Sequence, residues 1–186
     1  DKFSQKQNFK IIHFSTDCVF DGNQGSYKET DIPLPRDFYG LSKLLGELNS
    51  ETSLTLRTSI IGHEIGSSFS LVEWFLSSKG NVKGYTKAIY SGFPTVEIAR
   101  IIHKFIIPNK SIHGIYNLSS EPISKYELLK IISKQYNHKI SITPEESVSI
   151  DRSLDSSLFT SKTNYICPSW HKLINEMYEF YKKYEY

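Results

Sequence analysis

Short apolar runs alternate with amphipathic segments along this chain of 186 residues. Residues 10–14 form an apolar run that ends in polar residues, as is typical of a buried strand in a parallel sheet. Residues 54–61 form a second, β-branched run, and the segment 37–49 between the two runs predicts a helix. Strands that alternate with helices predict an α/β fold.

The alternation continues through the second half of the chain. Residues 114–118 predict a further strand, and residues 140–142 predict a short one. We expect Thr95 to be the N-cap of a helix, because threonine side chains accept hydrogen bonds from the first backbone N–H groups of helices. The remaining predicted elements are helices at 71–76, after the capping box Ser124–Glu127 and at 169–183, and a solvated turn around Gly80 and Gly84 that includes Lys83 and Lys87.

Charge and composition exclude several classes of function. The 22 basic and 20 acidic residues are interspersed, so we expect neither a nucleic acid nor a membrane as partner. No apolar run approaches the roughly 20 residues that a membrane-spanning helix needs. Cys18 and Cys167 form no C-x-x-C pair and the six histidines show no metal-ligand spacing, so we expect reduced thiols, a cytoplasmic location and no metal site. The chain does not begin with Met, and we expect it to begin inside a longer protein.

The strongest chemical signal is the segment Tyr39-Gly40-Leu41-Ser42-Lys43. Side chains four residues apart share one face of a helix, so the Lys43 ammonium can favour the phenolate of Tyr39 and lower its pKa. A tyrosine primed in this way can hand a proton to a developing alkoxide. Thr16 or Ser15, at the carboxyl end of the preceding strand, can hold the substrate oxygen beside the phenol. This spacing also occurs by chance in many helices, so the wider pattern must support it.

The wider pattern consists of seven segments in a fixed order: 13–22, 27–33, 39–47, 56–59, 92–97, 114–119 and 152–157. Together they resemble the extended short-chain dehydrogenase/reductases, and most closely the dTDP-4-dehydrorhamnose reductase group of sugar-nucleotide reductases. The resemblance extends from about residue 11 to residue 177. Each motif alone is common, but the combination is specific.

This resemblance implies roles for the residues at the first strand and helix. Tyr39 is expected to be the general acid at C4 of the sugar, and Lys43 to hold the nicotinamide ribose and lower the pKa of the tyrosine. Thr16 would be the hydroxyl member of the catalytic triad. Ser15 would lie beside it at the cofactor, and Asp17 would help to position the substrate.

Further binding roles follow from the same resemblance. Arg57, Thr58 and Ser59 would border the nicotinamide at the end of the second strand. Arg152 could bind a phosphate of the sugar nucleotide, because its forked guanidinium matches phosphate geometry, or it could form a structural pair with an aspartate of its own loop. Trp74 lies in the segment expected to face the sugar, although a core position is the simpler expectation.

The resemblance also implies a domain organisation. Residues 1–62 would be the C-terminal part of a Rossmann-type NAD(P)-binding domain that carries the catalytic triad. Residues 63–186 would be a smaller α/β substrate-binding lobe, with parts of about 84–118 returning to the Rossmann-type sheet. NADP or NAD would be the cofactor, bound mainly by an N-terminal half with a glycine-rich turn that this sequence lacks. This chain alone is therefore expected to be inactive, and a homodimer is one assembly that the resemblance allows.

Two features leave alternatives open. Ile60 and Ile61 stand where reductases of the rhamnose precursor often carry an aromatic residue, so the identity of the sugar is open. The other functions compatible with the motifs are a non-catalytic sugar-nucleotide-binding or regulatory subunit of the same fold, and a nucleotide-sugar epimerase. A dehydratase ranks lower, because Cys18 occupies the place of an expected glutamate, and we interpret this cysteine as a small packing residue.

Overall fold

The first apolar runs of the sequence form a three-stranded parallel sheet. In this computed structural model, which describes residues 2–7, 9–64, 66 and 69–184, β1 (Ile11–Phe14) pairs with β2 (Ser53–Arg57), and β2 pairs with β6 (Gly114–Asn117). The order is β1-β2-β6, and every residue of β2 is buried. Because the strands run in one direction, their carboxyl ends lie at a common edge of the sheet.

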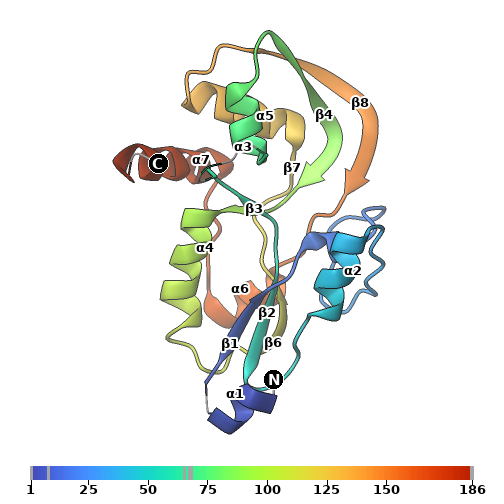
Figure 1. Cartoon of the computed structure of the whole chain (residues 1–186), viewed down its shortest axis with the longest axis vertical. Coiled ribbons are helices and arrows are strands. Elements are labelled where there is room, and N and C mark those ends of the chain that lie inside the picture. The colour runs from blue at the N-terminus through green and yellow to red at the C-terminus, as the bar shows by residue number, and fades with distance from the viewer. Residues whose placement is uncertain (1, 8, 65, 67–68, 185–186) are drawn as a thin grey trace.

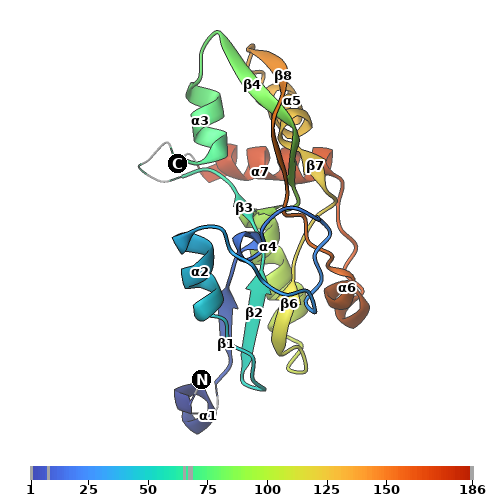
Figure 2. The same cartoon turned by 90° about the vertical axis from the view of Figure 1, so that its right-hand side faces the viewer.

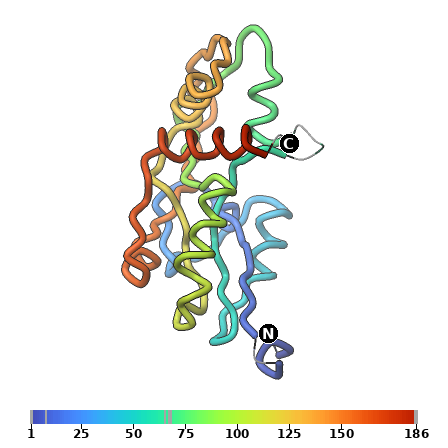
Figure 3. Tube along the Cα trace, turned by 90° about the vertical axis from the view of Figure 1, so that its left-hand side faces the viewer, coloured from blue at the N-terminus to red at the C-terminus, as the bar shows by residue number. Residues whose placement is uncertain are grey.

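Helices cover both faces of this sheet. α2 (Phe38–Leu45) lies on one face and α4 (Thr95–Ile101) on the other (Figures 1 and 3). Alternation along β1 fits this arrangement, because Ile12 and Phe14 pack into the main core while the ring of His13 lies on the side of α2. α4 continues as the π-helical turn η2 (Ile102–Ile106). The other elements of this region are α1 (Lys2–Gln7), the 3₁₀ turn η1 (Asp17–Val19) and α6 (Ser157–Thr163), which packs against β6.

A second region continues the molecule along its long axis (Figure 1). Its sheet has the order β7-β4-β8, in which β4 pairs with β8 in parallel and with β7 antiparallel. A short parallel pair, β3 with β5, connects the two regions, and α7 crosses at their junction (Figure 3). One core extends through both regions, from Leu54 of β2 to Leu128 of α5. The bounds are β3 (Ile60–Ile61), α3 (Leu71–Ser77), β4 (Asn81–Tyr90), β5 (Phe93–Pro94), β7 (Ile123–Ser124), α5 (Lys125–Gln135), β8 (Ser141–Asp151) and α7 (Trp170–Tyr184).

The prediction of a turn between Gly80 and Gly84 is wrong, except that Gly80 itself has turn geometry. Gly80 has a positive φ of 78°, which suits a turn, but Gly84 lies inside β4. A Cβ atom on Gly84 would approach within 2.6 Å of the ring of Tyr126, so this glycine allows α5 to pack closely over the strand. Lys83 and Lys87 accordingly extend from a strand and not from a solvated turn.

Other predicted bounds also change. The helix predicted over 37–49 ends at Leu45, and the strand predicted over 54–61 divides into β2 and β3 because the chain leaves the first sheet at Ser59, whose carbonyl oxygen accepts a hydrogen bond from the N–H of Phe93. The short strand at 140–142 is the beginning of β8, and α1 and α6 were not predicted. Thr95 is the first residue of α4 and not its N-cap, a position that Pro94 holds without a side-chain bond.

The predicted α/β class is confirmed by this architecture of parallel sheets and covering helices. Of the segment 84–118, α4 and β6 lie at the parallel sheet, whereas β4 belongs to the second region. Within the described ranges, every helix is too short or too polar to traverse a lipid bilayer.

Candidate active site

The predicted catalytic residues gather where β1 and β2 end. Ser15 and Thr16 follow β1 directly, and both are buried. The Thr16 side chain caps η1, since its Oγ1 accepts a hydrogen bond from the N–H of Cys18 at 3.2 Å. The Thr16 hydroxyl donates to Oδ1 of Asp17 at 3.2 Å. The hydroxyl proton that the resemblance assigns to the substrate oxygen is therefore held by Asp17 in this structure.

A close backbone contact holds α2 next to this strand end. The helix begins at its N-cap Asp37, whose carboxylate accepts from the N–H of Gly40 at 2.7 Å. A Cβ atom on Gly40 would lie 2.2 Å from the carbonyl oxygen of Cys18, so only glycine permits α2 to approach η1 this closely. The structure thus brings the helix that carries Tyr39 and Lys43 beside Thr16.

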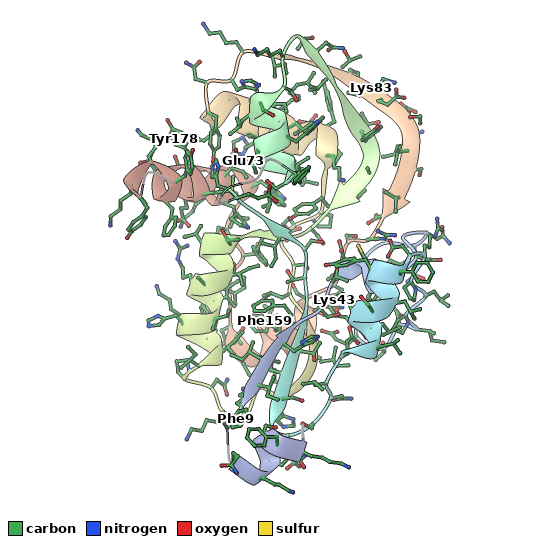
Figure 4. All side chains as sticks on the ribbon, viewed as in Figure 1. Phe9, Lys43, Glu73, Lys83, Phe159 and Tyr178 are labelled. Atoms are coloured by element: carbon green, nitrogen blue, oxygen red, sulfur yellow. The ribbon has the colours of Figure 1, made fainter. Side chains whose placement is uncertain are left out.

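Tyr39 and Lys43 lie on the accessible part of α2. The Tyr39 side chain is 57% exposed, and Lys43, which Figure 4 labels, is partly buried. Across the described ranges neither the phenol nor the ammonium has a hydrogen-bond or ion-pair partner. Both polar groups are therefore available to a ligand.

Glu47 is the residue at this edge whose role the sequence did not reveal. Its carboxylate forms a bidentate ion pair with Arg57, with Nε to Oε1 at 2.8 Å and Nη2 to Oε2 at 2.7 Å. Ser15 Oγ donates to the same Oε1 at 2.7 Å. The side chains of Arg57 and Glu47 are only 4% and 5% exposed. Two residues predicted to meet the cofactor thus bind a buried carboxylate, although Nη1 of Arg57 is buried without a partner among the described residues.

The rest of the predicted cofactor edge follows Arg57 directly. Thr58 is buried and its hydroxyl donates to the carbonyl oxygen of Ser59 at 3.3 Å. Ser59 is half-buried and lies where the chain leaves β2 for β3. The guanidinium of Arg57 also lies over the ring of Phe20, 5.2 Å from its centroid. The three predicted residues therefore line one strand end beside Ser15.

Arg152 reaches the same site from the end of β8. Its Nη1 donates to Sγ of Cys18 at 3.3 Å, and its Nε is buried without a partner. The alternative of a pair with Asp155 is wrong, because within the described part of the chain Arg152 forms no ion pair and Asp155 instead accepts from the N–H of Ser157. Burial, and secondarily Asp17, raises the pKa of the Cys18 thiol, which agrees with a packing role for this cysteine.

Trp74 is not brought to this site by any contact in the structure. It lies on α3 in the second region, on the same helix as Glu73, whereas Lys43 lies on α2 (Figures 2 and 4). Trp74 is 43% exposed, so the expectation of a core position is wrong. No hydrogen bond or ring contact among the described residues connects Trp74 with Thr16.

His13 is a second feature that sequence reasoning missed. Its Nε2 atom is buried without a partner in the described ranges, so His13 is neither a surface residue nor a satisfied interior one, the two positions that the sequence favoured for its histidines. Burial lowers the pKa of His13, and the Lys43 ammonium lowers it further, while the Glu47 carboxylate acts in the opposite direction. Both charges therefore lie near this ring. Within residues 2–7, 9–64, 66 and 69–184, no three His, Cys, Asp or Glu side chains form a candidate metal site.

Comparisons with known proteins agree with this arrangement. The chain is 36% identical over 133 residues to a dTDP-4-dehydrorhamnose reductase from Aggregatibacter actinomycetemcomitans, covering 66% of this chain and 45% of that protein. It is 29% identical over 169 residues to methionine adenosyltransferase 2 subunit beta from Xenopus laevis, covering 82% of this chain and 51% of that protein. The chain thus spans about half the length of these relatives.

The fold is also that of solved reductase structures. The crystal structure of dTDP-4-dehydrorhamnose reductase from Bacillus anthracis in complex with NADP superimposes with a TM-score of 0.79 at 23% identity, covering 95% of this chain and 67% of that one. This likeness establishes the Rossmann-type α/β fold. A family model described as the RmlD substrate binding domain matches residues 2–183. The chain therefore belongs to the RmlD substrate binding domain family.

Proposed function

We propose that this chain carries the proton-donating and substrate-binding part of an enzyme that reduces a 4-keto nucleotide sugar with NADPH or NADH. The observation that carries the proposal is the contact of Gly40 with the carbonyl of Cys18, which places the helix of Tyr39 and Lys43 beside Thr16. Membership of the family and the reductase relative support the same reaction.

The residues at the strand ends fit a nicotinamide dinucleotide. The phenol of Tyr39, the ammonium of Lys43 and Nη1 of Arg57 all lack partners in the described residues, and a ligand with ribose hydroxyls and an amide oxygen would satisfy them. Lys43 would hold the ribose, while Ser15 and the residues from Arg57 to Ser59 would border the nicotinamide. When bound, the cofactor supplies the hydride for the carbonyl carbon.

The side chains of this chain would manage the proton. Tyr39 would donate its phenolic proton to the carbonyl oxygen, so that hydride addition at the carbon yields the alcohol. Thr16 would hold the same oxygen by turning its hydroxyl proton from Asp17 Oδ1, where it lies in this structure, to the substrate. Arg152 offers its guanidinium to a phosphate of the sugar nucleotide. Trp74 would contact the sugar only if α3 faces the bound substrate.

The substitution Tyr39→Phe tests this proposal in the full-length gene product. Turnover of a 4-keto nucleotide sugar with NADPH should fall by about 10²–10⁴-fold, because phenylalanine lacks the hydroxyl group that donates the proton. Tyr184→Phe, at an exposed tyrosine of α7, is the matched control and should leave turnover unchanged. Equal turnover of the Tyr39 variant and the wild type would contradict the assignment.

A second candidate is a non-catalytic subunit. Relatives named methionine adenosyltransferase 2 subunit beta align with 82% of this chain, against 66% for the reductase relative. Stable association of the full-length gene product with a methionine adenosyltransferase catalytic subunit, together with no reductase turnover, would favour this function. An epimerase is a third alternative, and it would interconvert nucleotide sugars without net oxidation of NADPH.

A further inference from the structure

Three charged or ionisable groups follow one another along α2 and its end. Tyr39, Lys43 and Glu47 are spaced four residues apart. Gly46 keeps right-handed helical angles (φ −87°, ψ −6°), and the N–H of Glu47 donates to the carbonyl of Leu44, so the last turn continues as far as Glu47. Besides burial, the charge of Lys43 lowers the pKa of His13 in β1 and that of Glu47 raises it, so both charges act on one ring.

A glutamate in this position would ordinarily attract the lysine. Lysine and glutamate four residues apart on a helix form ion pairs in many proteins. An ammonium drawn toward Glu47 would point along the helix away from Tyr39, because the two partners lie on opposite sides of Lys43 in the sequence. Such a pair would also weaken the favourable effect of the ammonium on the phenolate.

The structure occupies both oxygens of Glu47 with other donors. Oε1 accepts from Ser15 Oγ and from Nε of Arg57, and Oε2 accepts from Nη2 of Arg57. Lys43 has no carboxylate within ion-pair distance among the described residues. The bidentate geometry is the strongest that a guanidinium offers to a carboxylate, and its burial excludes competing water.

We infer that Arg57 and Ser15 sequester Glu47 and thereby keep the Lys43 ammonium free to act on Tyr39. This inference rests on the proposed function, in which Lys43 primes the phenol. Glu47 is then a positioning residue, which acts on the chemistry only through Lys43. Arg57 holds Glu47 through Nε and Nη2, while its Nη1 is buried without a partner among the described residues.

A merely structural ion pair makes a different prediction. Removing either partner of a buried pair leaves an uncompensated charge, so both single variants should lose stability and activity in parallel. Sequestration instead predicts an asymmetry. Arg57→Met releases a charged Glu47 that can capture Lys43, whereas Glu47→Gln removes the competing charge and leaves Lys43 free.

The first experiment measures kcat and KM across the pH range for the full-length gene product, under conditions where each variant is folded. Arg57→Met should lower kcat by on the order of tenfold or more and shift the pH profile, while Glu47→Gln keeps the wild-type profile. In the double variant Glu47→Gln/Arg57→Met no charged Glu47 is left to capture Lys43, so its pH profile should return to that of Glu47→Gln, even where loss of the Arg57 contact raises the KM for the cofactor. Glu97→Gln is the control, because Glu97 is a buried carboxylate paired with Arg100 on α4. Parallel losses in both single variants, or a double variant no better than Arg57→Met, would overturn the inference.

The second experiment does not depend on turnover. Acetic anhydride labels free amines, so pairing of Lys43 with Glu47 should slow labelling of Lys43, measured by peptide mass spectrometry. We expect slower labelling in Arg57→Met but not in Glu47→Gln or the double variant. If Arg57→Met does not fold, Arg57→Lys, which can bind only one oxygen of Glu47, should show the same slowing. Equal labelling rates in all variants would overturn the inference, whereas the expected rates with no reductase turnover would remove only the proposed function.

Discussion

Two regions of the molecule join neighbouring elements with charged side chains, but in opposite surroundings. At the end of the parallel sheet, Glu47 and Arg57 form an ion pair whose side chains are 5% and 4% exposed. On the β4–β8 ribbon, Lys83 pairs with Glu145 at 2.8 Å, with side chains that are 67% and 24% exposed. The same type of interaction is therefore buried at the candidate site and solvent-exposed on the ribbon, where Lys83, labelled in Figure 4, extends from β4.

This difference in exposure determines what each ion pair contributes to the structure. On the ribbon, backbone pairing of β4 with β8 already fixes the register, and water screens the charges. Charges on the exposed edge strand β8 also discourage pairing with other chains. At the sheet end, no backbone ladder among the described residues connects the end of α2 with β1 and β2. Side chains make the connection instead: Glu47 binds Ser15 and Arg57, and the Thr55 hydroxyl bonds the backbone of Leu48. The buried ion pair therefore fixes how the end of α2 sits against the strands, whereas the exposed pair has little effect on the geometry of the ribbon.

The largest expected effect on stability belongs to Arg57→Met. Removing one partner of a buried pair costs about 3–5 kcal/mol, because Glu47 loses the bidentate guanidinium that compensates its charge in the interior. Urea unfolding of the full-length gene product measures this loss. Lys87→Met, at a lysine whose side chain is 54% exposed, is the matched control and should cost far less. Similar losses of stability in the two variants would contradict the expected difference between the buried and the exposed ion pair.

A smaller loss is expected from Gly40→Ala. The new Cβ would lie 2.2 Å from the carbonyl oxygen of Cys18, which cannot move without displacing η1. Overpacking of this kind costs about 1–3 kcal/mol and should also lower turnover, because α2 moves away from Thr16. Gly46→Ala is the control at the opposite end of the same helix, since its Cβ would meet nothing closer than 3.5 Å. If both alanine variants behave alike in thermal unfolding and turnover, close approach at Gly40 is not what positions α2.

The contrast between local and long-range signals explains which features the sequence could predict. Tyr39 and Lys43 lie within one helix, and Thr16 follows a strand with a clear apolar pattern. Short segments of the sequence were therefore enough to predict both features. The role of Glu47 depends on Ser15, 32 residues earlier, and Arg57, 10 residues later, which meet it only after packing. The one available signal was a charged residue next to apolar neighbours in the segment 39–47.

The same limit applied to the second region. Glycine usually indicates a turn, and at Gly80 the positive φ agrees with that expectation. At Gly84 the glycine serves close packing of Tyr126 from α5, a contact that no local pattern contains. The β4–β8 pairing joins segments about 60 residues apart, so the length of β8 could not be read from residues 140–142 alone.

Burial also changes how the stability contribution of a carboxylate depends on pH. Burial raises the pKa of Glu29, whose Oε1 accepts from the N–H of Asn117, above its ordinary value of 4.5. The folded state therefore binds this proton more tightly than the unfolded state, and the resulting stability is present at low pH and lost as the pH rises through the raised pKa. Glu29→Gln cannot titrate, so relative to the wild type it should be more stable near neutral pH than near pH 4.5. Urea unfolding at both pH values tests this, and a difference that does not change with pH would contradict it.

The smallest effect is expected for Lys83→Ala on the ribbon. Lys83 lowers the pKa of Glu145 to about 2, so any stability from this pair is present above the ordinary value of 4.5 and is lost as the pH falls toward 2. Because both groups are solvated, screening should reduce this contribution below what thermal unfolding resolves, and Tm at neutral pH should be unchanged. The acid limb of the stability curve should likewise match that of the wild type. A drop in Tm as large as that of Arg57→Met would mean that the ribbon pair also fixes geometry, and that burial does not decide which charged contacts hold this fold together.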